Sequence, residues 1–423
     1  MKLTRYRSGT RCNSERWALY VVHATRAGLF AALLAALPAR AEDKPADPAS
    51  SPNPVLSVSG EYILDVVAVA RGTGTGVRHV DLASLVAALD LEAAAGWRGA
   101  RLVAEGIAGT GQRPNDLAGT LQGINNSEVT GNRLKLYQFY IEQALTDWPV
   151  TLRAGFIDLN AEFYSNDAAG LLIAPAFGIG SELAATGPNG PAIFPSTALT
   201  AAARVEPSAD TYAAFALVNA EAGVLGDIGG VRPMFDHGAL LIGEAGWKGA
   251  GKIALGVWAY TERQDDIRMV DDAGDPLQRR AQGGYVLLEW PIGAPIAPAE
   301  DAPRKASLFL RAGFSDGDTT PYRGGWQAGI LVNSVLPSRS ESQLSFGAHQ
   351  AFLSEKFRLN EAEVGNPLRD AETGLELILA DQVTPWLNLQ ADAQYVRNPG
   401  LAPGARDAII LGLRFVFAFT RDW

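Results

Sequence analysis

Polar side chains occupy every second position in several segments of this sequence that are otherwise apolar. The clearest run is Asn388, Gln390, Asp392 and Gln394, which alternate with leucine and alanine. Successive side chains of an extended chain point to opposite faces, so these four would form one polar ladder. Amides donate and accept hydrogen bonds and carboxylates accept them. The ladder could therefore form hydrogen bonds to a hydroxyl-bearing solute in place of water, and this role involves no covalent reaction.

Charged side chains follow the same alternation elsewhere. The period of two places a further set on the polar faces of other segments: Arg153, Glu142, Asp90, Glu92, Arg311 and Arg414. Arg153 leads into a long segment rich in glycine and proline, and Glu142 lies on the expected neighbouring strand, so we expect these two to pair. For each charge the sequence leaves two interpretations open, namely contact with a solute or a structural ion-pair ladder.

Residues for covalent or metal chemistry form no recognisable site. Asp90 and Glu92 could suggest the paired carboxylates of a glycosidase, but nothing else in the chain completes such a site. No serine stands in a pattern that positions a histidine beside it, which argues against a lipase. The 4 histidines lack metal-ligand spacing, and the only cysteine is Cys12. We expect no enzymatic activity, no cofactor and no metal.

The polar positions belong to segments whose alternation predicts β-strands with one apolar face. Tyr137, Phe139 and Ile141, for example, are expected on such an apolar face. No apolar run is long enough to cross a bilayer as a helix. We distinguish about sixteen strands, at 56–70, 79–95, 99–110, 133–146, 149–159, 197–206, 210–220, 238–248, 251–262, 281–291, 305–315, 322–334, 341–351, 372–381, 385–396 and 406–420.

The lengths of the connections distinguish a barrel from a sandwich. Alternate connections are short, such as Asp147-Trp148, and the intervening ones are mostly long and polar, at 111–132, 160–196, 221–237, 263–280 and 352–371. Segment 292–304 breaks this rhythm. Short turns at one end and long loops at the other are typical of outer-membrane barrels. We therefore predict an all-β, transmembrane antiparallel β-barrel with long external loops and short periplasmic turns.

The two ends of the chain indicate an exported protein. A basic region, the apolar run Ala27–Leu37 and the pattern Ala39-Arg40-Ala41 predict a signal peptide over residues 1–41. Residues 42–54 predict a flexible lead-in, and residues 55–423 the barrel domain. A net charge of -10 argues against nucleic acid as a partner.

The last expected strand carries an aromatic stripe. Phe415, Phe417 and Phe419 share one face, and the chain ends in Trp423. A soluble protein rarely exposes such a stripe, whereas a barrel wall presents it to lipid. Outer-membrane lipid and the barrel-assembly machinery, through this C-terminal strand, are therefore expected partners.

Several stretches together resemble the carbohydrate-selective porins of the OprB family, in the family's order and over nearly all the chain after residue 41. They are Ala88-Leu89-Asp90-Leu91-Glu92 followed by Gly96-Trp97-Arg98-Gly99; Leu152-Arg153-Ala154-Gly155-Phe156-Ile157-Asp158-Leu159-Asn160; Leu308-Phe309-Leu310-Arg311-Ala312-Gly313-Phe314; and Val383-Thr384-Pro385-Trp386 with Asn398-Pro399-Gly400. The family pattern tends to have proline where this chain has Ala391.

The resemblance implies a sixteen-stranded barrel in the bacterial outer membrane, through which small sugars and other polar solutes diffuse passively. By analogy with porins, segment 160–196 is expected to fold into the barrel and narrow it. Its aromatic residues would provide either a stacking surface for sugars or packing against the wall: Phe163, Tyr164, Phe177 and Phe194.

Two other functions remain open at this point. Arg153, Arg311 and Arg414 would suit a general or anion-preferring porin on the same barrel. A soluble secreted β-sandwich that binds a ligand would share the alternation of the strands. A monomer and a homotrimer are both compatible with the sequence.

Overall fold

The computed structural model describes residues 54–130, 133–222, 234–292 and 306–423. The expected signal peptide, nearly all of the lead-in and nearly all of segment 292–304 lie outside these residues. The strands are β1 Leu56–Arg71, β2 Gly76–Asp90, β3 Ala100–Gly111, β4 Arg133–Leu145, β5 Val150–Ile157, β6 Ala198–Ser208, β7 Thr211–Asn219, β8 Ala239–Trp247, β9 Lys252–Val270, β10 Pro276–Ile292, β11 Ala306–Ser315, β12 Tyr322–Asn333, β13 Gln343–Leu353, β14 Ala371–Thr384, β15 Leu387–Arg397 and β16 Ala408–Asp422.

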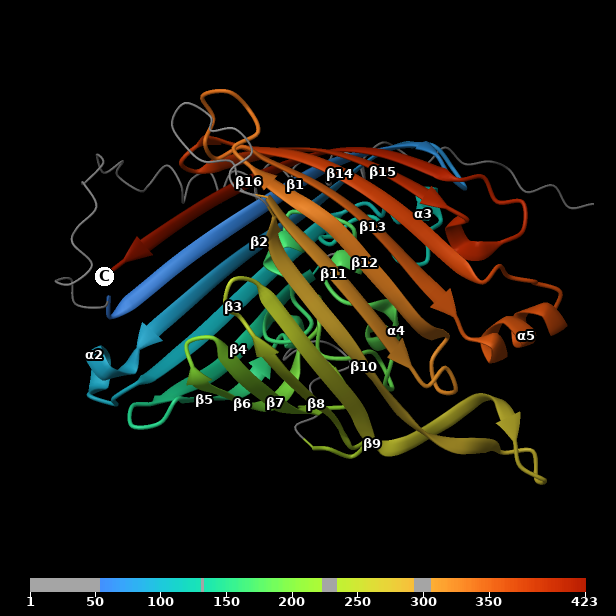
Figure 1. Ribbon diagram of the computed structural model, residues 1–423, viewed down its shortest axis with the longest axis horizontal. Coiled ribbons are helices and arrows are strands. Elements are labelled where there is room, and N and C mark those ends of the chain that lie inside the picture. Colours follow the sequence, from blue (N-terminus) through green and yellow to red (C-terminus); the bar gives the residue numbers. More distant parts are fainter. Residues whose placement is uncertain (1–53, 131–132, 223–233, 293–305) are drawn as a thin grey trace, which may run out of the picture. The chain divides into compact units, whose positions relative to one another are not determined.

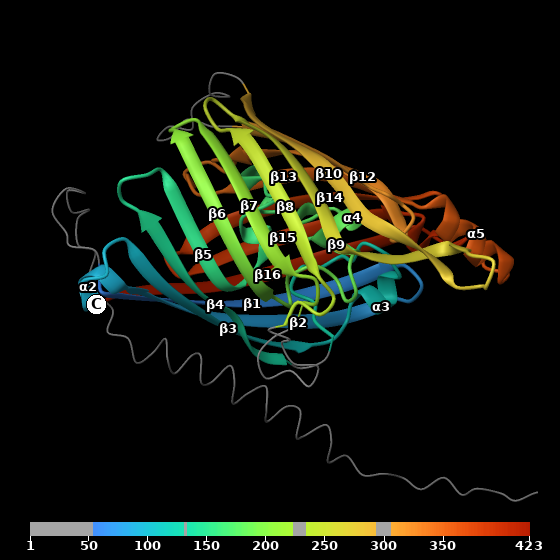
Figure 2. The same cartoon turned by 90° about the horizontal axis from the view of Figure 1, so that it is seen from below.

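These strands form one closed barrel in which each strand pairs antiparallel with its sequence neighbours (Figures 1 and 2). Closure comes from β1 and β16, which pair from Ser57 and Asp422 at one end to Arg71 and Ile409 at the other. The barrel predicted from the alternation is therefore confirmed, and each expected segment overlaps one strand. A β-sandwich is excluded, since the sheet has no free edge.

Helices occur only in the connections of the described chain. They are α2 Leu91–Ala95, α3 Asn115–Ala118, α4 Ser181–Ala184 and α5 Glu355–Glu363, with 3-10 turns η1 Leu159–Ala161, η2 Asp167–Ala169, η3 Pro175–Phe177 and η4 Pro399–Leu401. None of the helices in the described residues is long and apolar enough to span a bilayer. We call the end of the barrel that holds α2 and the C-terminus the turn end, and the opposite end, with α3 and α5, the loop end (Figure 1).

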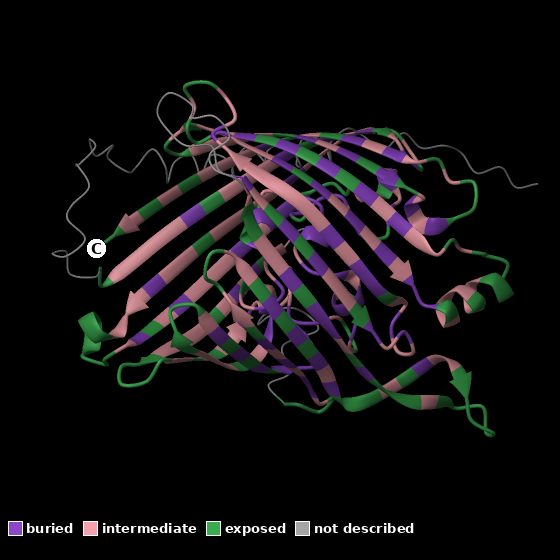
Figure 3. Cartoon of the chain, viewed as in Figure 1, coloured by how far each residue is buried: buried purple, intermediate pink, exposed green. Residues whose placement is uncertain are grey.

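The outer wall of the barrel is apolar and exposed. Leu255, Val257 and Phe314 are 65%, 67% and 63% exposed, while the residues between them in each strand are buried or half-buried. Figure 3 shows this alternation as stripes along β11 to β14. In water such a surface would be costly, but in a bilayer it contacts acyl chains.

Tryptophans form a belt at the turn end. Trp97, Trp148 and Trp386 lie in turns, Trp247 and Trp290 stack on each other near the ends of their strands, and Trp423 directly follows β16. An indole has an apolar body and one N–H donor, so it prefers the boundary between lipid and water. The belt therefore marks where one membrane interface meets the barrel.

The prediction of a long loop at 263–280 is wrong. Strands β9 and β10 continue to Val270 and from Pro276, so only 271–275 form the turn of a long hairpin. The hairpin extends past the barrel rim (Figure 1) and is fixed to α5 by ion pairs of Asp266 with Lys356 and of Arg268 with Glu363, each 2.5 Å. Charged residues occur on both of its faces, so the apolar alternation that identifies a wall strand is absent there.

Candidate functional site

The connection between β5 and β6, residues 158–197, folds into the barrel, as expected for segment 160–196. Its side chains pack on the inner wall in two clusters, one of which includes Phe163, Tyr164 and Leu183, at most 2% exposed. It carries η1, η2, η3 and α4 inside the ring of strands (Figures 1 and 2). We call it the first inner loop.

Buried charges on the wall hold the first inner loop in place. Arg311, fully buried on β11, donates to the carbonyl oxygens of Tyr164, Ala176 and Gly178 at 2.9–3.1 Å. Glu376 on β14 is 1% exposed and accepts from the backbone N–H groups of Ile173 and Ala174. Backbone groups of an irregular loop have no sheet partners, and leaving them unpaired away from water is costly. The wall charges supply those partners.

A second connection also folds inward, which the sequence did not predict. Residues 112–132, between β3 and β4, are bound by Glu372, which accepts from the backbone of Leu121 and Gln122 at 2.9–3.1 Å. Gln394 donates to the carbonyl of Ile124 at 2.9 Å. We call residues 112–132 the second inner loop, of which residues 131–132 lie outside the described chain.

An ion pair anchors the tip of the second inner loop. Arg414 and Asp65 are bidentate at 2.7 Å, and both are nearly fully buried. Asn125 donates to Asp65, and Arg414 donates to Asn126 and Ser127. A sequence signal for this anchor does exist, because Asp65 is the only charge in an otherwise apolar stretch of β1, and a buried carboxylate requires partners.

The two inner loops touch each other across the lumen. The backbone N–H of Asn126 donates to the carbonyl of Ile173 at 2.9 Å, and Gly123 lies so close to Pro175 that a Cβ there would be 3.0 Å from the proline ring. The constriction of this barrel is therefore built by two loops rather than one.

A cavity of about 430 Å³ lies between the inner loops and the wall, and we call it the loop-side cavity. Its polar lining includes Gln122, Asn125, Glu128, Asp158 and Asn160, and its aromatic lining includes Phe177, Phe194 and Tyr322. Both are needed to bind a molecule that has hydroxyls around its rim and C–H groups on its faces.

Asp158 is the titratable group at the start of the first inner loop. Burial raises its pKa to about 6, while hydrogen bonds from the Tyr137 hydroxyl and the Asn160 N–H oppose this rise. Tyr137 was expected on the outer face, and that expectation is wrong. A β-bulge after Leu136 adds one residue to β4 and re-aims the ring, so that Tyr137 is buried with its hydroxyl 2.7 Å from Asp158.

The expected pairing of Arg153 with Glu142 is present. The Arg153 Nε lies 2.6 Å from Glu142, and its Nη1 lies 2.9 Å from Glu162 of the first inner loop. Glu162 also binds Arg204 of β6 at 2.6 Å, so it bridges two neighbouring strands. The sequence did not single out Glu162 or Arg204.

Neither Asp90 nor Glu92 lines the lumen as predicted: Asp90 is the last residue of β2, and Glu92 lies beyond the strand in α2. Asp90 is the N-cap of α2 and accepts from the backbone N–H groups of Glu92 and Ala93 at 2.9 and 3.0 Å. Glu92 accepts from Gly99 at 3.0 Å, and Gly96 ends the helix at φ 72. Helix-forming residues between a capping aspartate and a glycine close a short turn, so both carboxylates belong to the turn end.

The remaining predicted residues divide into two groups. Arg311, Arg414, Asp392 and Gln394 are at most 8% exposed, and the inner loops cover them. Asn388 and Gln390 are half-buried nearer the turn end, where Gln390 donates to Asn388 at 3.1 Å.

Of the loop aromatics, Phe163, Tyr164 and Phe177 are packing residues, while Phe194 is half-buried and lines the loop-side cavity.

Comparison with known families gives one match that spans most of the chain. The family described as carbohydrate-selective porin, OprB family, matches residues 75–419. Among curated proteins, Porin B of Pseudomonas aeruginosa is 24% identical over 212 residues, which cover 43% of this chain and 46% of that protein. The chain therefore aligns with about half the length of this relative.

Solved structures share the fold. Pseudomonas putida OprB at high pH superimposes with a TM-score of 0.76 at 20% identity, covering 86% of this chain and 94% of that one. The outer-membrane channel DcaP of Acinetobacter baumannii has a TM-score of 0.54 at 10% identity, covering 86% and 97%. At these identities the likeness concerns the barrel and not its solute.

Proposed function

Because the chain belongs to the OprB family of carbohydrate-selective porins, we propose that its loop-side cavity is where a sugar is held on its passage through the barrel. The protein is a porin of the bacterial outer membrane, and small solutes cross it by passive diffusion. The proposal concerns glucose-like sugars and the residues that contact them.

The lining of the loop-side cavity is the observation that carries this proposal. Asp158 and Asn160 contribute polar side chains to the lining, and Phe194 and Tyr322 contribute aromatic rings. A sugar loses water contacts to its hydroxyls when it enters a narrow passage, and the polar groups replace them. Its C–H faces bury apolar area on the aromatic rings.

The state of the arginines favours a sugar channel over an anion-preferring pore. Arg311 is bound to three loop carbonyls, Arg414 is paired with Asp65, and Arg153 is paired with Glu142 and Glu162. A positive charge that is already compensated attracts a passing anion only weakly. These arginines are therefore held by protein groups rather than presented to a passing anion.

Several further properties accompany this proposal. The barrel would have no catalytic activity, residues 1–41 would be a cleaved signal peptide, and β16 would engage the assembly machinery. The exposed outer residues, such as Val257 and Phe314, would contact lipid.

Purified porin in planar bilayers tests the proposal. Glucose added to the bath is expected to lower the KCl conductance in a saturable way, because a bound sugar blocks ion flow. An unchanged conductance over a concentration series of glucose and maltotriose would contradict it. Reversal potentials in a KCl gradient test the anion-preferring alternative, which predicts a strong anion preference.

A further inference from the structure

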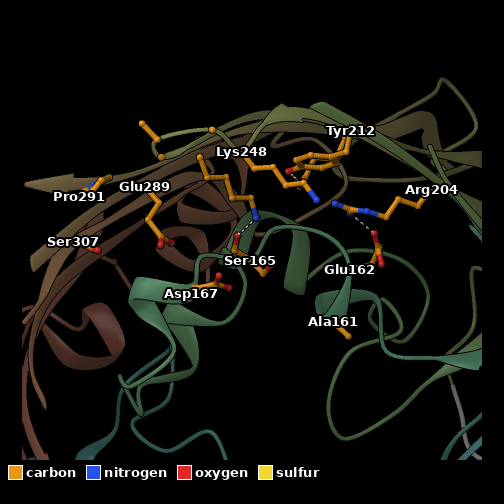
Figure 4. A pocket seen from close by; sticks show the side chains of 15 residues that line it. Ala161, Glu162, Ser165, Asp167, Arg204, Tyr212, Lys248, Glu289, Pro291 and Ser307 are labelled. Atoms are coloured by element: carbon orange, nitrogen blue, oxygen red, sulfur yellow. Dashed lines mark hydrogen bonds and ion pairs between the residues drawn. The ribbon is translucent and has the colours of Figure 1, made fainter. Parts of the chain in front are cut away.

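A second cavity of about 490 Å³ lies on the turn side of the first inner loop, and we call it the turn-side recess (Figure 4). Its floor is the turn between β8 and β9, with Pro291 of β10 and Ser307 of β11 beside it. Its roof is the segment from Ala161 to Asp167. It shares no lining residue with the loop-side cavity.

Donors and acceptors alternate around the turn-side recess. Arg204, Lys248 and Lys252 are its cations, Glu162, Asp167 and Glu289 are carboxylates of the same lining, and Arg204 pairs with Glu162 at 2.6 Å. A fourth carboxylate, Glu244, already accepts from the hydroxyls of Tyr212 and Tyr285 and from the backbone N–H of Tyr164. Three cations thus stand against four carboxylates, so the lining carries charges of both signs with a small net charge, which selects against a strongly charged ligand.

Two of these groups keep hydrogen-bonding capacity that is directed into the recess. Lys252 Nζ has three N–H donors, and the described contact is one hydrogen bond of 2.7 Å to the carbonyl of Ser165. Glu289 accepts from the backbone N–H of Ala168 with one oxygen, at 3.0 Å. In Figure 4 the Glu289 side chain extends from the wall toward the roof, on the side of Asp167, and the hydrogen bond of Lys252 to Ser165 brings its amine to the same roof.

We infer that the turn-side recess binds a neutral polyhydroxylated solute of one or two sugar rings, as a second station that opens toward the turn end. Hydroxyls both donate and accept, so they match a lining of mixed amines, carboxylates and a serine. The volume lies in the range of small-ligand sites, roughly 300–1,000 Å³. This inference rests on the proposed sugar passage and adds a site to it.

The consequence is that sugar binding depends on the side from which the sugar arrives. From the turn end, a sugar meets the recess before the inner loops. From the loop end, it meets the loop-side cavity first. A channel with one station between the loops would lack this separation.

Sugar-induced current noise, recorded with glucose on one side of the bilayer at a time, tests this inference. A label on Asp272→Cys in the exposed tip of the β9–β10 hairpin reports the orientation of each channel. Lys252→Met removes the amine from the recess. Ser307→Phe fills the recess with a larger side chain and leaves the Lys252 amine in place. Phe194→Ala is the matched change in the loop-side cavity.

For turn-side glucose, we expect residence to shorten about five- to tenfold in Lys252→Met, as for loss of one or two hydrogen bonds, and to shorten also in Ser307→Phe. Loop-side glucose should respond more strongly to Phe194→Ala than to these two variants, because it meets the loop-side cavity first. Unchanged turn-side residence in both recess variants overturns the second station. An absence of any sugar response in the wild type from either side overturns the proposed function itself.

Discussion

Glu376 of β14 accepts a hydrogen bond of 2.5 Å from the backbone N–H of Ile173, which lies 203 positions earlier in the chain. The same carboxylate accepts from Ala174 at 3.0 Å. One buried side chain thus fixes the middle of the first inner loop to the far wall. The size of the pore then depends on wall residues that a solute does not touch.

Replacing this carboxylate should loosen the constriction. In Glu376→Ala, two backbone N–H groups lose their acceptor in a buried place, at a cost of about 1–3 kcal/mol for each group. We expect a larger single-channel conductance with more open-channel noise. We also expect the barrel to unfold at a lower temperature, which is measured by its heat-modifiable migration on gels.

A matched control separates this effect from a general loss of charge. Glu341 is exposed in the turn between β12 and β13, so Glu341→Ala should leave conductance and unfolding temperature at wild-type values. A Glu376→Ala channel with wild-type conductance and noise would show that the loop holds its position without the clamp.

The strands could be predicted because the barrel wall separates two solvents. Each strand has one apolar and one polar face, and this difference appears in the sequence as a period of two. The same reasoning failed for 263–280, where charged residues lie on both faces of the hairpin and no apolar face is present. It also failed at Tyr137, because a bulge shifts the register by one residue.

The contents of the barrel were harder to predict than its wall. The second inner loop is held by Glu372, whose partner Leu121 lies 251 positions away, and no local pattern reports such a contact. Lumenal charges such as Arg311 were identified correctly as inward-facing, but the sequence left open whether they bind solute or structure. Arg311 is buried under the first inner loop and bonded to its backbone, so its role is structural.

Asp158 should make the ion selectivity depend on pH. Burial raises its pKa to about 6, with the Glu105 charge adding a small rise, so the carboxyl is mostly charged at pH 7.5 and mostly neutral at about pH 5. Protonation removes one negative charge from the loop-side cavity. Reversal potentials measured between these pH values should therefore shift toward anions through a midpoint near 6.

The free energy of unfolding also depends on the protonation of Asp158, and it should fall as the pH rises. A carboxyl whose folded pKa lies above its unfolded value binds protons more tightly when folded. The stabilisation is therefore fully present below pH 3.8 and is lost as pH rises through about 6. Asp158→Asn should remove both the selectivity step and this stability change, and persistence of the step in this variant would assign it to another group.

Removal of Glu162 should convert the balanced constriction into an anion-preferring one. This carboxylate pairs with both Arg153 and Arg204, at 2.9 and 2.6 Å. In Glu162→Gln both arginines keep their charge but lose a partner, so the reversal potential in a KCl gradient should move toward chloride.

Glu206 provides the comparison for Glu162. It also contacts Arg204, at 3.2 Å, but its side chain is 44% exposed at the end of β6. Exposed pairs contribute little because water screens them, so Glu206→Gln should change selectivity much less. Equal shifts in the two variants would mean that net lumenal charge, and not the bridge, sets the preference.

Phe194 should determine how long a sugar remains in the loop-side cavity. Its ring is half-buried and packs edge-on against Tyr137 with ring centroids 6.0 Å apart, so one face is available to the cavity. A sugar face that buries roughly 20–50 Å² of apolar area on the ring gains about 0.5–1.3 kcal/mol, so Phe194→Ala should shorten glucose residence by about two- to tenfold. The KCl conductance without sugar should stay the same or rise, because the change removes bulk.

Phe163→Leu, which alters a fully buried packing residue, should instead lower thermal stability with little effect on residence. A Phe194→Ala channel with wild-type residence times would place the sugar contact away from this ring.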